Sequence, residues 1–345
     1  MRPHDIKHRT KGQVMKRALF LLLLVLATPA FAITIKTLDV NDIDDDRIEI
    51  TAPVWDGSKT GVVLVGTFES KFDRKVANKL GSGFRNSMMP SYDLAPTLDL
   101  GQIVAETLRT EGTKLGLTMM SPQEARAPQW TIDGTIHNAS VDIQHMGYGS
   151  LLFYTYLDLE VRVTPKDGQP TTHRIRPARL FVMYNGGMGM GDEVQASLAK
   201  IVLVGAQQIL ARLNREHFKA PALPAMETRL AGLKRIDDRG ETELHAIGLS
   251  GVRGASAALA SRLETEKDEN VRTSLVYALT SLGVEEHVPL LAKRYASEDA
   301  DVRYATIIAL GNAGTPEALA LIREQGMKDE TLIIRKLSER LLIGR

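Results

Sequence analysis

The sequence predicts an α+β two-layer sandwich in its N-terminal part and an all-α helical solenoid in its C-terminal part. In residues 33–218, stretches with an apolar residue at every second position alternate with helical patterns. From residue 226 onward only short helical patterns occur, and Asp-Glu-Asn-Val-Arg at 268–272 recurs as Asp-Ala-Asp-Val-Arg at 299–303. The spacing between these two motifs, with two helices in each unit, is typical of solenoids. The repeats of a solenoid bury their apolar faces against one another.

The first 32 residues have the pattern of a secretory signal peptide. Lys16-Arg17 precede an apolar run over 18–27, and Ala30-Phe31-Ala32 follows. The run is shorter than the roughly 20 residues that cross a membrane. We therefore expect export to the periplasm, cleavage after Ala32, and a mature chain that is soluble and has no stable membrane span. Translation starts at Met1 or at Met15, and either start gives the same mature chain.

Composition excludes several classes of function. The chain contains no Cys, which excludes disulfides, thiolate metal sites and a lipid-bearing Cys. Removing residues 1–32 takes six basic residues and one acidic residue from totals of 43 and 42, which leaves a net charge of −4. This charge argues against nucleic acid as a general partner. The mature chain is long enough for two domains of about 150 residues each.

The sandwich is expected to contain one strand, one helix, three strands and a second helix, in that order. In the clearest strand, Leu157, Leu159 and Val161 alternate with polar residues, which predicts a sheet with one solvated face. In the strand before it the apolar phase slips, and a bulge near His137-Asn138 would keep one face buried. The expected strands span 61–66, 130–144, 151–163 and 174–184, and the expected helices span 100–115 and 193–213.

Three stretches of this part carry a resemblance to a known family. They are Gly-Val-Val-Leu-Val-Gly-Thr-Phe at 61–68, Gly-Phe-Arg-Asn-Ser at 83–87, and Gly-Gln-Ile-Val-Ala-Glu-Thr-Leu at 101–108 followed by Leu-Gly-Leu at 115–117. They resemble the small periplasmic YajG-type lipoproteins, which are related in shape to the auxiliary lipoproteins of lipid and lipopolysaccharide transport. The resemblance covers about residues 60–215 and implies an α/β fold without catalytic residues. This chain departs from the family because it lacks the lipid-anchoring Cys and carries a repeat array.

Residues 219–225 are expected to be a linker, because Pro221 and Pro224 end the preceding helix and stiffen an extended connection. The stretch 226–345 then resembles HEAT-type repeats. Its last helix lacks a polar capping helix after it, so we expect either an exposed docking end or packing onto the previous repeat or the sandwich. The expected helices span 241–252, 255–264, 269–282, 286–296, 300–312, 316–325 and 330–343.

The repeats place Asp and Arg residues at a regular spacing. Asp268 precedes Arg272 by four residues and Asp299 precedes Arg303 by four, while Arg335 follows in a third, weaker unit. In HEAT-like arrays such residues stack into a ladder, in which an Asp at a helix start favours free backbone N–H groups and pairs with the Arg of a neighbouring repeat. We expect these residues to stabilise the array rather than to bind a ligand.

Motifs for catalysis are missing from the sequence. No Gly-x-Ser-x-Gly turn is present, and no two histidines lie three or four residues apart after the signal segment. We therefore expect a protein that is not an enzyme, with no cofactor and no metal site. The scattered histidines are His137, His145, His173, His217, His245 and His287.

The segment Asn-Gly-Gly-Met-Gly-Met-Gly-Asp at 185–192 leads from a strand into a helix. Its backbone N–H groups could bind an anion, or it is a mobile surface loop that ends with Asp192 as the helix cap. Its central residues Gly187, Met188, Gly189 and Met190 are the candidate contact site for a partner or an apolar ligand. The methionines of this half also suggest copper handling, although Met more often fills gaps in cores.

These observations favour a non-enzymatic periplasmic adaptor that binds envelope or secreted proteins through both halves. The first alternative is a transport accessory or carrier that holds a lipid-like or other small apolar ligand in the sandwich. The second is copper handling, which requires several Met side chains to converge on one point. If the solenoid docks a partner, we expect Arg294 and Arg323 to be exposed on its surface.

Overall fold

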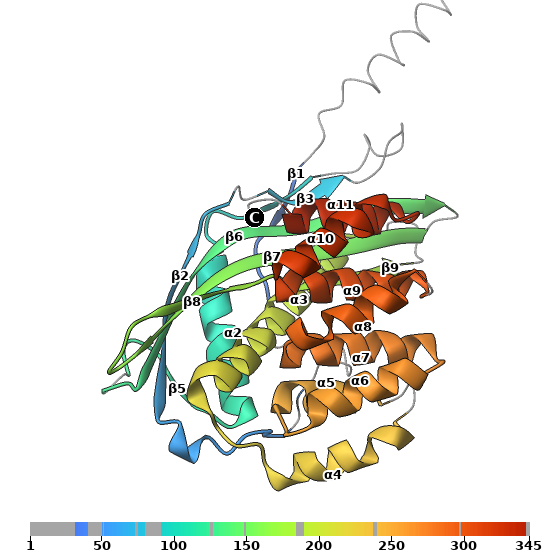
Figure 1. Ribbon diagram of the computed structural model, residues 1–345. Coiled ribbons are helices and arrows are strands. Elements are labelled where there is room, and N and C mark those ends of the chain that lie inside the picture. The colour runs from blue at the N-terminus through green and yellow to red at the C-terminus, as the bar shows by residue number, and fades with distance from the viewer. Residues whose placement is uncertain are drawn as a thin grey trace, which may run out of the picture.

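The computed structural model describes most of the chain after the predicted signal peptide, and it contains a mixed sheet with helices followed by helical repeats, as the sequence predicts (Figure 1). Residues 1–31 lie outside the described part, and so do residues 187–189 of the predicted contact loop. The described residues are 32–40, 50, 52–72, 75–79, 91–124, 127–147, 150–183, 190–236, 240–296 and 298–342.

The described strands form one mixed sheet around a long antiparallel pair, β6 and β7, which runs from Trp130↔Pro165 to Gly147↔Ser150. At one end of this pair, β2 lies beside β6 and β8 beside β7. At the other end, β3 lies beside β6 and β9 beside β7. The strands are β1 (Ala32–Ile35), β2 (Val62–Ser70), β3 (Lys75–Lys79), β4 (Ser91–Leu94), β5 (Thr118–Met120), β6 (Trp130–Gly147), β7 (Ser150–Pro165), β8 (Thr171–Ile175) and β9 (Ala178–Met183).

The bulge expected in β6 is present. The pairing of β6 with β7 shifts register between Ile136 and Asn138. Ile136 before the shift and Ala139 and Val141 after it are all fully buried. One inserted residue therefore keeps the apolar side chains of an 18-residue strand on one face, although their phase changes along the sequence.

Two helices cover that face; the first has the predicted bounds, and the second begins at residue 190 rather than at the predicted residue 193. Helix α2 (Leu100–Leu115) begins at Asp99, whose Oδ1 accepts a hydrogen bond from the Gln102 N–H at 3.1 Å, and ends at Gly116 with a left-handed φ of 110°. Helix α3 (Met190–Leu213) buries Leu198, Ile201 and its other apolar residues against the sheet. Within the described residues, Asp192–Phe218 is long and apolar enough to cross a membrane, but 83% of its most apolar window is buried in this core.

The repeats consist of two rows of helices. Helices α5, α7, α9 and α11 pack side by side, and α6, α8 and α10 lie against them (Figure 1). Pro224, which the sequence analysis assigned to an extended connection, is instead the first residue of a helix, where its missing N–H costs nothing. The helices are α4 (Pro224–Gly232), α5 (Glu241–Ser250), α6 (Ala255–Thr265), α7 (Glu269–Leu282), α8 (Val288–Tyr295), α9 (Ala300–Ala313), α10 (Pro316–Glu324) and α11 (Leu332–Leu342).

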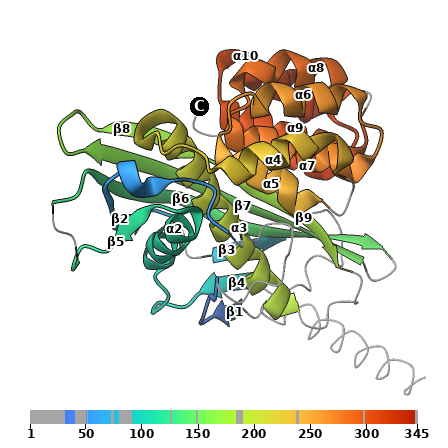
Figure 2. The same ribbon diagram turned by 90° about the horizontal axis from the view of Figure 1, so that it is seen from below.

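The repeats cover the face of the sheet that the sequence analysis expected to be solvated. Figure 2 shows the repeats on the side of the sheet opposite α2. On that side Tyr154, Tyr156 and Asp158 of β7 are at most 6% exposed, and the Tyr154 ring meets the Tyr304 ring of α9 edge-on with centroids 5.9 Å apart. The expected solvated face is therefore wrong for the middle of β7. It holds further along the strand, where Arg162 is exposed.

The last helix packs inward, as one of the two alternatives for the chain end expected. Leu337 and Leu341 of α11 are fully buried in the same apolar cluster as Tyr154. Arg340 of α11 donates a hydrogen bond to the Ser140 hydroxyl of β6 at 2.5 Å, and its guanidinium lies 5.8 Å from the centre of the Tyr154 ring. The C-terminal helix thus contacts both long strands of the sheet.

A buried arginine joins the sheet to two repeats. The strand expected at 174–184 is divided into β8 and β9 at Arg176-Pro177, and Arg176 is 0% exposed. Its Nε donates to Asp158 Oδ1 at 3.2 Å, and its Nη1 donates to the Leu341 carbonyl of α11 at 3.0 Å. Its backbone N–H donates to Asn312 Oδ1 of α9 at 3.2 Å. A charge this deep is tolerated only because it is paired and hydrogen-bonded.

Asp158 is the anionic partner in this cluster. Arg174 donates to both of its carboxylate oxygens at 2.7 Å. Burial by itself raises the pKa of the Asp158 carboxyl, but the hydrogen bonds and charges of Arg174 and Arg176 hold that pKa below its usual value. The carboxylate is therefore ionised at neutral pH, and its negative charge compensates the positive charge of the buried guanidinium.

Replacing Arg176 tests whether this cluster holds the two parts together. We expect Arg176→Ala to lower the free energy of unfolding by about 3 kcal/mol, because it removes half of a buried ion pair and leaves the Leu341 carbonyl without its donor. Urea unfolding followed by circular dichroism measures the change. Arg162→Ala, at an exposed position of the same long strand β7, is the control and should change stability by less than about 0.5 kcal/mol. Equal effects of the two substitutions would contradict a structural role for the cluster.

Candidate functional site at the junction of the sheet and the repeats

The residues predicted to form a ladder do link consecutive repeats. Arg272 pairs with Asp299 of the next repeat at 2.5 Å, and its Nε lies 2.8 Å from Glu298 Oε2. Each ladder Arg also donates to the backbone carbonyl five residues before it, as Arg303 does to Glu298 O at 2.8 Å. Asp268 caps α7 by accepting hydrogen bonds from two backbone N–H groups at 2.9 and 3.1 Å. Asp299 makes no such cap bond and is instead the partner of Arg272.

The ladder continues to a residue that the sequence analysis left out. Arg303 donates to both carboxylate oxygens of Asp329, at 2.8 and 3.2 Å, and the Tyr295 hydroxyl donates to Asp329 Oδ2 at 2.6 Å. Asp329 lies six residues before Arg335 rather than four, yet it takes the place that Asp299 has in the previous repeat. Arg335 closes the array by donating to the backbone carbonyls of Asp329 and Glu330.

A second row of arginines runs along the other helices of the repeats. Arg262 of α6 and Arg294 of α8 each pair with the Glu four residues later, and each donates to a carbonyl of the preceding repeat, Leu263 O at 2.7 Å in the case of Arg294. Arg294, expected to be an exposed docking residue, is therefore half-buried and structural. Arg323 is exposed, as expected.

The ladder predicts a large loss of stability for Arg303→Ala. We expect the free energy of unfolding to fall by about 3 kcal/mol, because the substitution leaves the buried Asp329 carboxylate without its main counter-charge. Arg323→Ala on the exposed surface of α10 is the matched control, with an expected change below about 0.5 kcal/mol. Chemical denaturation of both variants, without any partner present, measures the difference. A melting transition of Arg303→Ala that coincides with the control would remove the structural assignment.

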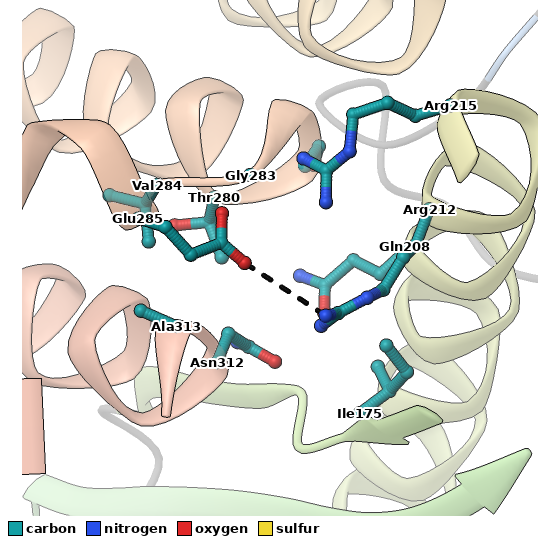
Figure 3. A pocket seen from close by; sticks show the side chains of 11 residues that line it. Ile175, Gln208, Arg212, Arg215, Thr280, Gly283, Val284, Glu285, Asn312 and Ala313 are labelled. Carbon is teal, nitrogen blue, oxygen red and sulfur yellow. Dashed lines mark ion pairs between the residues drawn. The ribbon is translucent and has the colours of Figure 1, made fainter. Parts of the chain in front are cut away.

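Two adjoining pockets lie between the C-terminal end of α3 and the repeats. Figure 3 shows the first, where Gln208 and Arg212 of α3 face Glu285 and Asn312, with 3.9 Å between Arg212 Nη2 and Glu285 Oε1. The second encloses about 230 Å³ and shares Arg215 with the first. Polar and apolar side chains both line these pockets. The Gly/Met loop, beneath which an apolar ligand was expected, lies largely outside the described residues. The apolar ligand therefore stays a prediction.

The cations of these pockets have a structural role. The C-terminal ends of α5 and α7 border the second pocket, and carbonyl groups at helix ends carry partial negative charge. Arg215 donates a hydrogen bond to the Leu282 carbonyl at the end of α7. Deeper in the same junction, Gln207 donates to Glu111 of α2 at 2.8 Å and bonds to His245 of α5 at 2.8 Å. The junction is thus a continuous polar network between α2, α3 and the repeats.

Two histidines that are 44 residues apart meet at the edge of this junction. His173 of β8 and His217 of the π-turn after α3 (η3, Asn214–Phe218) place their Nε2 atoms 2.8 Å apart. The Thr171 hydroxyl lies 3.3 and 3.2 Å from these two nitrogens. Glu216 Oε2 lies 3.4 Å from the opposite nitrogen of His173, Nδ1. His173, Glu216 and His217 form a group whose donor atoms lie close enough together to hold one metal ion.

This group was not predicted from the sequence, because its two histidines do not lie on one helix. The signal that could have indicated it is Thr171-x-His173, because alternate residues of a strand share a face. Which segment lies opposite that face depends on how α3 ends against the sheet. Only the tertiary structure decides that.

Charges and burial around the histidines favour their neutral forms. Burial lowers the pKa of His173 and the nearby Arg212 adds to this effect, although Glu216 opposes it. Burial likewise lowers the pKa of His217, with a contribution from Lys219. For Glu216, burial raises the carboxyl pKa, but the charge of Arg212 and the hydrogen bond from Arg215 lower it more. At neutral pH the cluster therefore combines two neutral imidazoles with one carboxylate.

These shifts predict a pH dependence of stability. Because both folded-state pKa values lie below the usual 6.5, the unfolded chain binds more protons as pH falls through 6.5. Acidification through that window should therefore lower the free energy of unfolding, and the fall should stop once the folded histidines are also protonated. Urea unfolding at pH 7.5, 6.5 and 5.5 measures it. The double substitution His173→Gln and His217→Gln should flatten the difference, whereas parallel profiles would contradict the assignment.

The predicted contact loop lies largely outside the described residues. Gly187, Met188 and Gly189 lie outside the described residues, and Met190 is the first residue of α3. Asp192, expected to cap this helix, lies instead in its first turn. The expected convergence of methionines on copper involves residues that lie mostly outside the described side chains. It stays a prediction.

Comparison with known proteins supports the repeat half. Residues 256–343 match a family model described as HEAT repeats, which covers α6 to α11 and confirms the predicted helical repeats. Among curated proteins, none matched the chain.

Solved structures show a weak likeness to about half of the chain. A Xanthomonas campestris protein of family DUF330 is 10% identical over 52% of this chain and 91% of its own, with a TM-score of 0.33. An uncharacterised protein is 14% identical over 46% of this chain and 99% of its own, with a TM-score of 0.26. A PelC variant from Paraburkholderia phytofirmans, which forms a dodecamer, is 9% identical over 45% of this chain and 94% of its own, with a TM-score of 0.21. At these scores the likeness carries no argument, and the resemblance to YajG-type lipoproteins stays a prediction.

Proposed function

We propose that this protein is a non-enzymatic adaptor of the bacterial periplasm. We further propose that the outer row of its repeats, formed by α6, α8 and α10, binds a protein of the cell envelope. The proposal rests on the contacts that the inner row, formed by α5, α7, α9 and α11, makes within the chain. Helices α5 and α7 contact α3, and α9 and α11 bury their apolar residues on β7. The inner row is thereby occupied within the chain, which leaves the row of α6, α8 and α10 for a partner.

The character of the outer row supports a protein partner. HEAT-type repeats are generally surfaces for protein interaction, because stacked helices present one continuous face. Exposed residues of both signs lie on this row, including Glu264 of α6, Lys293 of α8, and Arg323 and Glu324 of α10. Such mixed charge suits a polar, reversible contact with another folded protein, in which charge complementarity determines specificity.

The proposed location rests on the sequence. A basic segment, an apolar run over 18–27 and Ala30-Phe31-Ala32 form the pattern of a cleaved secretory signal. The absence of Cys agrees with a chain that needs no disulfide after export. The assignment as a non-enzyme rests on the sequence as well, since no catalytic motif is present.

Charge reversal on the outer row tests the adaptor role. We expect the combined Lys293→Glu and Arg323→Glu substitution to reduce capture of the partner at least tenfold without lowering the melting temperature. In-cell crosslinking, recovery from the periplasmic fraction and mass spectrometry measure both the captured protein and cleavage after Ala32. Lys71→Glu on the exposed end of the sandwich is the matched control.

Unchanged capture by the reversed variant, or no specific protein captured by the intact chain, would overturn the proposal. Point substitutions are a better test than removal of the repeats. Truncation before α4 would expose Tyr154, Tyr156 and Arg176, which are buried in the intact chain. Loss of capture by a truncated chain would then report unfolding of the sandwich as readily as loss of an interface.

A further inference from the structure

We propose that His173, His217 and the Thr171 hydroxyl form a binding site for one divalent transition-metal ion, of the class of Zn²⁺ or Cu²⁺. This site is independent of the adaptor surface, because it lies at β8 and the end of α3 rather than on the outer row of the repeats. It uses none of the residues proposed to contact a partner.

The distances among the three donor atoms fit one ion. Ligands bound to the same metal at about 2.0–2.1 Å lie roughly 3 Å from one another. The two Nε2 atoms are 2.8 Å apart, and the Thr171 oxygen lies 3.2–3.3 Å from each of them. Imidazole nitrogen is the ligand that suits Zn²⁺, Cu²⁺ and Ni²⁺. With three donors from the protein, a fourth position is left for water or a side chain of another molecule.

The group around His173 holds it in the tautomer that a metal needs. Glu216 Oε2 lies 3.4 Å from Nδ1, on the side of the ring away from His217. A carboxylate there favours the tautomer with its proton on Nδ1 and leaves the lone pair of Nε2 free to bind, as the outer partners of metal-bound histidines do. Glu216 is fixed in turn by Arg212 at 2.9 Å and by Arg215 at 3.2 Å.

The backbone that carries His217 has an unusual conformation. The last turn of α3 widens into a π-turn, and Lys219 after it has a φ of +55°, which non-Gly residues rarely adopt. Asn214 holds this conformation, because its Oδ1 accepts from the Ala220 N–H at 2.8 Å and its Nδ2 donates to the Ala220 carbonyl at 3.0 Å. Single π-turns and strained residues are frequent at functional sites. Here the turn directs His217 toward β8.

Packing fixes the second imidazole and leaves the site accessible. The Trp130 ring lies 6.0 Å from the His217 ring and 5.4 Å from the Phe218 ring. The His173 side chain is 9% exposed, whereas Thr171 is exposed at the edge of the sheet. An ion can therefore enter past Thr171 without movement of the core. Arg212, Arg215 and Lys219 nearby oppose a dication, and the Glu216 carboxylate offsets part of that charge.

Titration of the untagged mature chain with Zn²⁺, after chelator treatment and dialysis, tests the site. Isothermal calorimetry should show one ion bound per chain. His173→Ala and His217→Ala should each weaken binding at least tenfold, and Thr171→Ala, at an exposed position where folding is not at risk, should weaken it several-fold. His137→Ala, in a pair with Glu160 outside this group, is the control and should bind Zn²⁺ as the parent does.

Electron paramagnetic resonance of the Cu²⁺-loaded chain gives a second readout that does not depend on the stability of the variants. We expect a spectrum with coupling to two imidazole nitrogens in the parent. Absence of stoichiometric Zn²⁺ binding, a spectrum without nitrogen coupling, or binding that survives in both histidine variants would overturn the proposal. Unchanged binding by Thr171→Ala would remove the hydroxyl from the ligand set.

Discussion

The pairing of Arg176 with Asp158 is the interaction on which the arrangement of this protein depends. It lies where β8 gives way to β9, and the same guanidinium donates to the end of α11. A buried charge that is hydrogen-bonded to both parts stabilises only one relative position of them, because any displacement would break a bond to the charge or to the carbonyl. The apolar contact of Tyr154 with Tyr304 stabilises the association of the two parts, whereas the ionic cluster determines their relative position.

This arrangement changes what the repeats can do. A free solenoid offers two faces, but here the inner row completes the core of the sandwich, and one apolar cluster runs from the sheet into α5 and α7. The sheet gains a second covered face, and the repeats gain a rigid base. A partner bound to the outer row would therefore contact a surface whose curvature is fixed by the sheet beneath it.

The same packing brings the residues of the histidine group together. His173 and His217 lie 44 residues apart, and the Thr171-x-His173 spacing does not indicate which segment lies opposite it. They meet because the π-turn after α3, which the Asn214 side chain holds by two hydrogen bonds to Ala220, places His217 beside β8. The polar junction beside them has a different character, since its arginines are occupied by helix-end carbonyls and by Glu216.

Local patterns in the sequence determined most of the secondary structure. The periodicity of α2 and α3, the bulge after Ile136, and the spacing of Asp268, Arg272, Asp299 and Arg303 all act over a few residues or one repeat, so they can be read along the chain. Short strands such as β1 and β5 carry too few residues to show a period. What covers Tyr154 and Tyr156, why Arg176 is buried, and which histidines meet were decided by tertiary structure alone. These depend on contacts between residues up to 186 positions apart, and the periodicity of one segment carries no information about which distant surface will cover it.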